Sequence, residues 1–311
     1  QRTLRIPDDD GTYPLPPGLG RFPVRLVDDY GERLPSEWRR HGGVMLPMYQ
    51  SEALWINFSP HHDSERGTAY PFVVKVASGK VNAVTGDPWL DGLQEQPQDY
   101  VVASRQPWLD GFCVEKGVIR QFVAMPLGAG YTAEEQITGA AQHGGLQLAV
   151  FPMKADAFER RFPKRQRNWH MRASVPEALC SVGREMGLAP GGQMRQELYE
   201  DPFAFDDWDT GTSARCFVHI ANSLVWRSVT GSEPPSAPLT SAEYTRHGLP
   251  WFDYYDDSAT AVEGADELAG LKSIAAKAEQ DGQKPLPENE SVTPGRVVKL
   301  SRSRVVRQGE M

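Results

Sequence analysis

Short β-strand patterns fill the first half of this chain and constrain its fold more than any other feature. Between residues 22 and 153, β-branched and aromatic runs alternate with Gly, Pro, Asn and Asp. This alternation is typical of short strands joined by turns, and its spacing predicts an antiparallel sandwich or barrel. The runs are FPVRLVDD, GVMLPMYQ, ALWINFS, YPFVVKVA, KVNAVT, DYVVAS, VIRQFVAMP and GLQLAVFPM.

Two local signals refine this prediction. Ser78-Gly79 separates FVVKVA from KVNAVT and predicts a two-residue hairpin turn. Thr132 and Glu135 have the spacing of a capping box, so a short helix is expected to follow Thr132 and to stop at Gly139.

The hydrophobic period changes in the second half of the chain. Phe217, Ile220, Ala221, Leu224 and Val225 follow the i, i+3, i+4 spacing of a helix with one buried face. Capping residues and glycine stops bound this helix and two others. The three predicted helices run from Ser174 to Gly187, over 213–230 to Gly231, and from Thr260, capped with Glu263, to Gly282.

These signals predict an α+β protein with a β-rich N-terminal part and a smaller helical region packed on it. The predicted divisions are an irregular arm at 1–20, a β-rich domain at 21–153, a basic connecting loop at 154–174, a helical region at 175–282, and an extended or disordered tail at 283–311.

Charge and composition exclude several classes of protein. The net charge of −8 makes nucleic-acid binding unlikely, and no run approaches the roughly 18 apolar residues that span a bilayer. The three cysteines are widely spaced, which favours a reducing compartment over a disulfide framework. We therefore expect a soluble, cytoplasmic protein without membrane insertion. No cofactor is expected, because the glycine-rich nucleotide loops and the common hydrolase and metalloprotease motifs are missing from the sequence.

Three Pro-Trp-x-Asp units recur in the chain, as DPWLDG at 87–92, QPWLDG at 106–111 and PWFD at 250–253. One interpretation makes Trp89 and Trp108 ligand-binding platforms, as in a carbohydrate-binding module. The other makes the units turns whose indoles pack back onto a sheet. We favour the second, so Trp89 and Trp108 are expected to be mostly buried, and the third unit is expected to contribute to domain packing.

The connection MPLGAGYTAEEQITGAAQHGGLQ at 125–147 is the best place for chemistry. Glu135 and His143, with Tyr131, could form an acid–base pair on a loop held by two apolar strands. Thr132 and Glu134, at the start of a helix, could contact a small polar or anionic ligand. The alternative is a long hairpin excursion whose polar groups cap one another.

Two stretches have weak metal-ligand patterns. Asp207 and Asp209 precede Gly211 in a D-x-D-x-G order, which is half of a calcium loop, although an acidic entry to the 213–230 helix explains the same residues. HHDSE at 61–65 has metal-ligand residue types, but adjacent side chains of an extended segment point apart. We expect no metal at either stretch.

Two charged features need partners. Lys75 lies in an apolar strand, where it must reach an edge or pair with an acidic residue. The basic run at 160–172 is expected to dock against the acid-rich stretch 197–209, either within one chain or between subunits. Docking between subunits would make Arg160, Arg161, Lys164 and Arg165 the basis of a salt-sensitive homo-oligomer.

Several longer motifs carry a family resemblance. They include GGVMLPMYQSEALWINF, VASGKVNAVTG, VIRQFVAMPLGAGYTAEEQITG, CFVHIANSLVWRSVTG and GLPWFDYYDD. Over about 20–280 the chain resembles a family of uncharacterised bacterial and fungal proteins, some of which carry the label "integral membrane protein". The resemblance implies no activity and no catalytic residues, and the label conflicts with the lack of a spanning segment.

Three functions remain open from the sequence. The leading one is a non-catalytic binding or structural protein that self-associates, because catalytic signatures are missing and aromatic residues, which are enriched at interfaces, are frequent at turns. The second is an enzyme, such as a hydrolase, that uses the 131–143 loop. The third is the carbohydrate-binding module described above.

Overall fold

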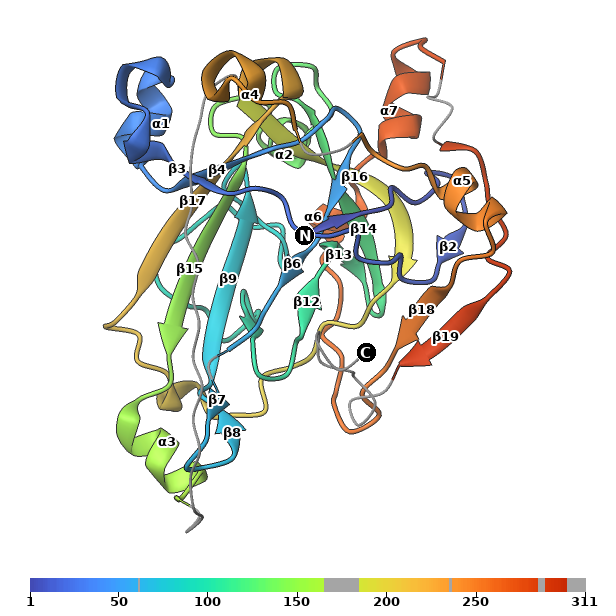
Figure 1. The fold of residues 1–311 in the computed structure, drawn as a ribbon. Helices are drawn as coiled ribbons and strands as arrows, with labels where there is room; N and C mark the ends of the chain where they lie inside the picture. The colour runs from blue at the N-terminus through green and yellow to red at the C-terminus, as the bar shows by residue number, and fades with distance from the viewer. Residues whose placement is uncertain (61, 165–184, 235–236, 285–288, 301–311) are drawn as a thin grey trace.

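The computed structural model describes residues 1–60, 62–164, 185–234, 237–284 and 289–300 (Figure 1). The protein is α+β, as predicted, and is built on one large sheet of 13 strands that are mostly antiparallel. Its main path joins β1 (Arg2–Thr3), β5 (Ala53–Leu54), β14 (Val118–Pro126), β16 (Glu185–Arg195), β17 (Ala214–Ala221), β15 (Leu146–Pro152), β9 (Phe72–Ser78) and β10 (Val81–Asn82).

Shorter strands branch from this path. Those in the large sheet are β2 (Thr12–Tyr13), β3 (Arg25–Leu26), β4 (Val44–Pro47), β11 (Val101–Val102) and β13 (Gly111–Glu115). The two-stranded pairs are β6 (Ile56–Asn57) with β12 (Trp108–Leu109), β7 (His62–Asp63) with β8 (Thr68–Ala69), and β18 (Trp251–Tyr254) with β19 (Val297–Leu300). In the described part of the chain β1 and β10 do not pair with each other, so the sheet is open rather than a closed barrel.

Helices cover the ends and one side of the sheet. Their bounds are α1 (Ser36–His41), α2 (Ala133–Thr138), α3 (Ala155–Arg161), α4 (Ser223–Thr230), α5 (Ser241–Arg246), α6 (Asp266–Ala269) and α7 (Ile274–Gln280), with 3₁₀ turns at Val27–Asp29, Gly31–Arg33 and Phe205–Asp207. Figure 1 shows α1 and α4 at one end of the sheet and α3 at the other. Trp38 of α1 and Trp226 of α4 meet in one buried cluster.

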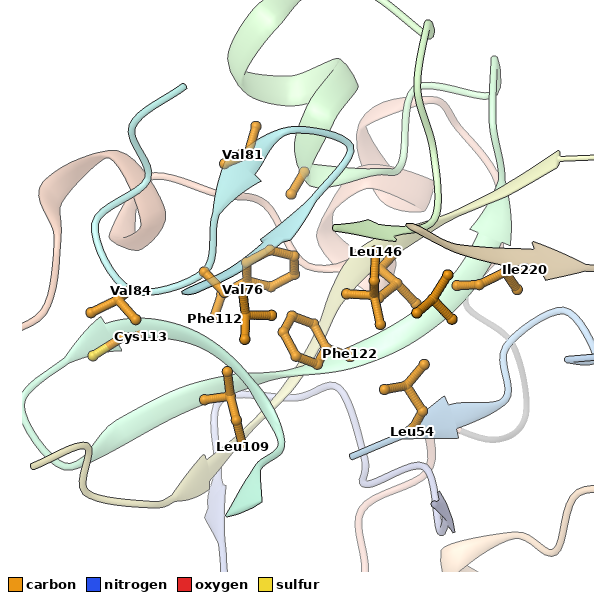
Figure 2. Packing of buried hydrophobic residues seen from close by; sticks show 14 of the residues in the cluster. Leu54, Val76, Val81, Val84, Leu109, Phe112, Cys113, Phe122, Leu146 and Ile220 are labelled. Carbon is orange, nitrogen blue, oxygen red and sulfur yellow. The ribbon is translucent and has the colours of Figure 1, made fainter. Parts of the chain in front are cut away.

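The main hydrophobic cluster lies where the two halves of the sheet face each other. Leu54 and Phe122 come from β5 and β14, and Leu146 and Ile220 come from β15 and β17. Figure 2 shows these side chains pointing into one interior. Alternate residues of each strand face it, as the period of two requires, so the sheet curls around this cluster.

The helix predicted over 213–230 is wrong in its first half. Residues 214–221 form β17, which pairs with β15 on one edge and with β4 on the other. Val218 and Ile220 face the main cluster, whereas Phe217 and His219 face the opposite side, so a period of two replaces the apparent helical period. The second half is helical: Asn222 caps α4, which ends at Gly231 as predicted.

Two more helix predictions need correction. Met186 and Gly187 lie in β16, while residues 165–184, including the predicted start at Ser174, lie outside the described residues. Residues 260–263 form no helix, because Ala261 bridges to Tyr199. The stretch contains two short helices, α6 and α7. Leu268, Ala275 and Ala278 in these helices, and Leu271 between them, are buried as the spacing indicated.

Two turn predictions have different outcomes. The capping box of α2 is confirmed, with Thr132 and Glu135 in their expected roles and Gly139 as the left-handed stop. The hairpin turn after β9 is shifted by one residue. Its two central residues are Gly79 and Lys80, both with positive φ, because Ser78 still pairs with Val81.

The N-terminal arm is part of the core, contrary to its irregular sequence. Leu4 and Ile6 are fully buried in a second cluster, together with Trp251. The buried side chain of Gln121, on β14, holds the arm: its amide nitrogen donates to the Leu4 carbonyl at 2.8 Å and its oxygen accepts from the Ile6 N–H at 3.0 Å. One side chain thus satisfies the backbone of a segment that has few strand partners of its own.

We expect Leu4→Ala to lower the free energy of unfolding by about 3 kcal/mol, because it leaves a cavity at a side chain with 0% exposure. The matched control is Leu224→Ala, since Leu224 is 68% exposed and should change the free energy by less than about 0.5 kcal/mol. Urea denaturation of both variants measures the difference, and equal losses would show that the arm is not a core segment.

Candidate functional site

The loop between Tyr131 and His143 holds its carboxylates in structural roles. The carboxylate of Glu135 accepts hydrogen bonds from the N–H groups of Gly128 and Gly130 at 2.9 and 2.8 Å and from the Thr132 hydroxyl at 2.7 Å. The N–H groups that an anion near residue 132 would need therefore already donate to Glu135. The Tyr131 hydroxyl donates to the side chain of Gln283.

Glu134 fixes the other end of the same loop. Its buried carboxylate accepts from the N–H groups of Gln142, His143 and Gly144 at 2.8–2.9 Å. Burial and the nearby Lys80 ammonium lower the pKa of the His143 imidazole, while Glu134 opposes the shift. In the described part of the chain no hydrogen bond joins His143 to Glu135, so the structure does not bring the proposed acid–base pair together.

The predicted metal-ligand residues have other partners. The buried carboxylate of Asp207 pairs with Arg161 at 2.5 Å and with Arg160 at 3.5 Å. Asp209 accepts from the Gly211 N–H in its own turn. Among the described residues no cluster of His, Cys, Asp and Glu could hold a metal ion.

Part of the basic run docks within the chain, because Arg160 and Arg161 pair with Asp207 of the acid-rich stretch. Lys164 instead pairs with Glu65, outside that stretch, at 2.6 Å. Just before the run, Lys154 donates to the Asp206 carbonyl at 2.8 Å. Residues 165–172, which include Arg165, lie outside the described residues.

Lys75 is buried and fully partnered. Its ammonium contacts the Asp99 carboxylate and donates to the carbonyls of Leu90 and Gly92 at 2.8 and 3.0 Å. Burial raises the pKa of Asp99, and the hydrogen bond from Lys75 opposes this rise. The interaction pins the loop of the first Pro-Trp-x-Asp unit to β9, which is a structural role.

The three Pro-Trp-x-Asp tryptophans have different environments. Trp251 is fully buried in the second cluster, which confirms a packing role for the third unit. Trp89 and Trp108 are partly buried and pack against hydrophobic clusters, in agreement with the prediction of mostly buried rings, although part of each side chain stays accessible. The Lys75 ammonium and the Arg215 guanidinium both lie over the Trp89 ring, at 5.2 and 4.9 Å from its centroid, so these cations already occupy places that a stacked ligand would need.

Trp108 lines a pocket of about 200 Å³, which we call the Trp108 pocket. The pairing of β12 with β6 sets Trp108 beside Trp55, with their centroids 6.0 Å apart and their rings at 75°. Tyr254 packs on Trp108 at 5.1 Å. The lining residues are Leu15, Pro16, Pro17, Gly18, Trp55, Trp108, Asp110, Phe252 and Leu300.

Among the described residues that line this pocket, Asp110 is the only one with an ionisable side chain. It is buried, its carboxylate accepts from the Gln196 amide at 2.7 Å, and its own N–H donates back to Gln196 at 3.1 Å. Burial raises the pKa of the Asp110 carboxyl to about 7, against the opposing effects of hydrogen bonds from Gln196 and Trp108 and of the amino group of residue 1. The carboxyl is therefore poised between its neutral and charged forms near neutral pH.

The sequence pointed to Trp108 but missed the residues around it. Trp55 belongs to a run that was interpreted only as a strand, and Phe252 belongs to the third Pro-Trp-x-Asp unit. Asp110 lies two residues after Trp108 in the second Pro-Trp-x-Asp unit. Its closeness to a candidate ligand-binding tryptophan was the one sequence feature that could have identified it as a site residue. Nothing in the spacing could show that these segments meet.

We expect Lys75→Met to lower the free energy of unfolding by about 3–5 kcal/mol, because it leaves the Asp99 carboxylate buried without its cation. Lys116→Met is the control, since Lys116 and Glu263 form an ion pair with side chains 51% and 77% exposed, and its loss should cost less than about 1 kcal/mol. Chemical denaturation at pH 7 compares them, and a small effect at Lys75 would contradict its pinning role.

We expect the wild-type protein to lose stability relative to Asp110→Asn as the pH rises from about 4 to about 7. The folded pKa of about 7 lies above the ordinary value of 3.8, so the folded state binds the extra proton in this interval. The difference should reach at most about 4 kcal/mol, from about 1.4 kcal/mol per unit of pKa. Denaturation curves at several pH values measure the free energy of unfolding of both proteins. If this free energy changed with pH in the same way in both, the pKa of Asp110 would not be raised by folding.

Comparisons of this chain with protein-family models, with curated proteins and with solved structures found no match. In the described part of the chain no helix has the length and apolar character needed to cross a bilayer. The Trp108 pocket is therefore assigned from its own residues, of which three aromatic rings and one buried carboxyl group are the chemically informative ones.

Proposed function

We propose that this protein is a non-catalytic binding protein whose ligand is a small organic cation, of the alkylated ammonium type, held in the Trp108 pocket. The observation that carries the proposal is the combination of three aromatic residues, Trp55, Trp108 and Phe252, with the single buried carboxyl group of Asp110. Aromatic rings attract cations through their quadrupoles, and a carboxylate adds a full opposite charge.

The geometry of the rings supports a compact cation. Trp55 and Trp108 meet at 75°, so they present two differently oriented walls rather than one flat platform. A volume of about 200 Å³ fits a trimethylammonium group with a short substituent. A flat stacked ring would need parallel walls, which the two indoles do not offer.

The polarity of the lining selects among cations. A primary ammonium ion has three N–H donors, and a buried donor without an acceptor costs about 1–3 kcal/mol. Apart from Asp110, the lining side chains are apolar or aromatic, so a cation whose nitrogen carries only alkyl groups is favoured. The same lack of polar side chains disfavours a sugar, which would leave several hydroxyl groups unpaired.

The alternative functions have weaker support. An enzyme acting at the 131–143 loop would need a free carboxylate, whereas Glu134 and Glu135 each accept several hydrogen bonds from the loop itself. Self-association through the basic run would need unpaired charges, whereas Arg161 and Lys164 have acidic partners in the same chain.

We expect choline to bind with a Kd on the order of 0.1–1 mM, and its neutral isostere 3,3-dimethylbutan-1-ol to bind at least about tenfold more weakly. Choline affinity should rise about tenfold from pH 6 to pH 8, because the charged form of Asp110, whose pKa is about 7, becomes the main form. Isothermal titration calorimetry measures both quantities.

Two variants separate the pocket from the rest of the chain. Asp110→Asn should abolish the pH dependence and reduce the preference for the cation to the part that the aromatic rings supply, and Trp108→Leu should weaken choline binding. Asp91→Asn is the matched control, because Asp91 occupies the same position of the first Pro-Trp-x-Asp unit with a side chain that is 90% exposed. Equal binding of the cation and its isostere, or equal losses in the Asp91 and Asp110 variants, would refute the proposal.

A further inference from the structure

A second and larger pocket opens into the main hydrophobic cluster from the other side of Trp55. Its volume is about 380 Å³, within the range of about 300–1,000 Å³ that is usual for small-molecule sites. Its floor consists of side chains from three neighbouring strands of the large sheet: Val44 and Leu46 on β4, Leu146 and Leu148 on β15, and Val218 on β17. Ile56 forms part of the opposite wall. We call it the sheet pocket.

The strand pattern explains why this floor is apolar and continuous. Val218 pairs with Val44 in one direction and with Leu146 in the other, so the three side chains stand in one row across the sheet. All three point to the side occupied by the main cluster, and Figure 2 shows Leu146 beside Leu54 in that interior. The short segments at 21–24 and 53–59 cover the row only in part, which leaves Val44 and Leu148 partly exposed.

The rim of the sheet pocket differs from its floor. Arg21 is the only lining residue with a charged side chain, and it is exposed. Asn57 and Ser59 add polar groups on the same rim, with the Ser59 hydroxyl donating to the Asn57 side-chain oxygen at 2.6 Å. This bond leaves the amide N–H₂ group of Asn57 as a donor, so the rim presents donors and a positive charge.

The geometry points to a binding site for an amphipathic anion, namely an alkyl carboxylate whose chain lies on the Val44, Leu146 and Val218 row and whose carboxylate meets Arg21. An alkyl chain needs apolar contacts without hydrogen-bonding groups, which the floor provides. A guanidinium group matches the two oxygens of a carboxylate. The site is separate from the Trp108 pocket in chemistry, although Trp55 lines both, and it does not depend on cation binding there.

The experiment compares three decyl compounds with the full chain: decanoate, decanol and decyltrimethylammonium, each below its micelle concentration. We expect one decanoate per chain by isothermal titration calorimetry, with decanol weaker by about three- to fivefold and the cation weaker still. The difference is modest because an exposed ion pair contributes only up to about 1 kcal/mol. Absence of saturable decanoate binding, or equal affinity for the anion and the cation, would overturn the inference.

Variants then locate the site. Arg21→Gln should remove the preference for decanoate over decanol and leave decanol binding unchanged, whereas Arg21→Lys should keep part of the preference. Leu148→Trp and Val44→Phe each fill the floor of the sheet pocket from a different strand. Each should weaken the binding of all three compounds at least tenfold. If one of these variants fails to fold, the other still tests the site. Trp108→Leu should leave decanoate binding unchanged. Decanoate binding that survives both filling variants, or that is lost with Trp108, would place the ligand elsewhere.

Discussion

The pairing of β14 on both of its edges is the constraint on which the rest of the structure depends. One edge runs along β16 from Val118 to Pro126, while the other is divided between β13 and β5. Segments more than 100 positions apart are thereby held side by side, as Val123 opposite both Ala53 and Ala189 shows. Because this strand is buried on both faces, its apolar run VIRQFVAMP is long and nearly uninterrupted.

Both pockets follow from this arrangement. Asp110 precedes β13, and its carbonyl accepts from the Phe122 N–H of β14 at 2.9 Å. Leu54 pairs with the same Phe122 on the same edge of β14, which brings Trp55 next to Trp108. The short segments at 21–24 and 53–59 cover the curled sheet only in part. The sheet pocket and the Trp108 pocket are the spaces that remain on either side of Trp55.

The sequence predicts the strands better than it predicts what joins them. Each of the apolar runs between 22 and 153 contains a strand, because alternation and turn residues are local signals. Local signals also located the capping box at Thr132 and the glycine stop at Gly231. They failed over 217–221, where pairing with two neighbours outweighs a helical period, and in the N-terminal arm, whose burial depends on the distant Gln121.

The candidate site was harder to predict because it depends on contacts between distant segments. Glu134 and Glu135 have the residue types of an active site, but their environment uses them to hold backbone N–H groups. Trp108 was identified from its motif, whereas its neighbours Trp55 and Phe252 come from segments about 50 and 140 positions away. The β12–β6 pairing brings Trp55 to Trp108, and the backbone bridge between Leu15 and Phe252 holds Phe252 at the pocket. The three Pro-Trp-x-Asp units are therefore similar turns with different surroundings rather than a repeated device.

The buried carboxylates Asp99, Asp207 and Asp110 differ in the positively charged groups that lie next to them. Asp99 meets a buried ammonium and Asp207 meets two guanidinium groups, so each has its counter-charge within the fold. Asp110 is as deeply buried, but the side chains that hydrogen-bond to it are the neutral amide of Gln196 and the indole of Trp108. A buried carboxylate without a cationic side chain is expensive unless it takes up a proton or a cation reaches it. The amino group of residue 1 also acts on Asp110, but it leaves the pKa of the carboxyl raised. Since Asp110 lies on the wall of an aromatic pocket, a cation from solution can neutralise it further, and this difference among the carboxylates is the physical basis for assigning the ligand's charge.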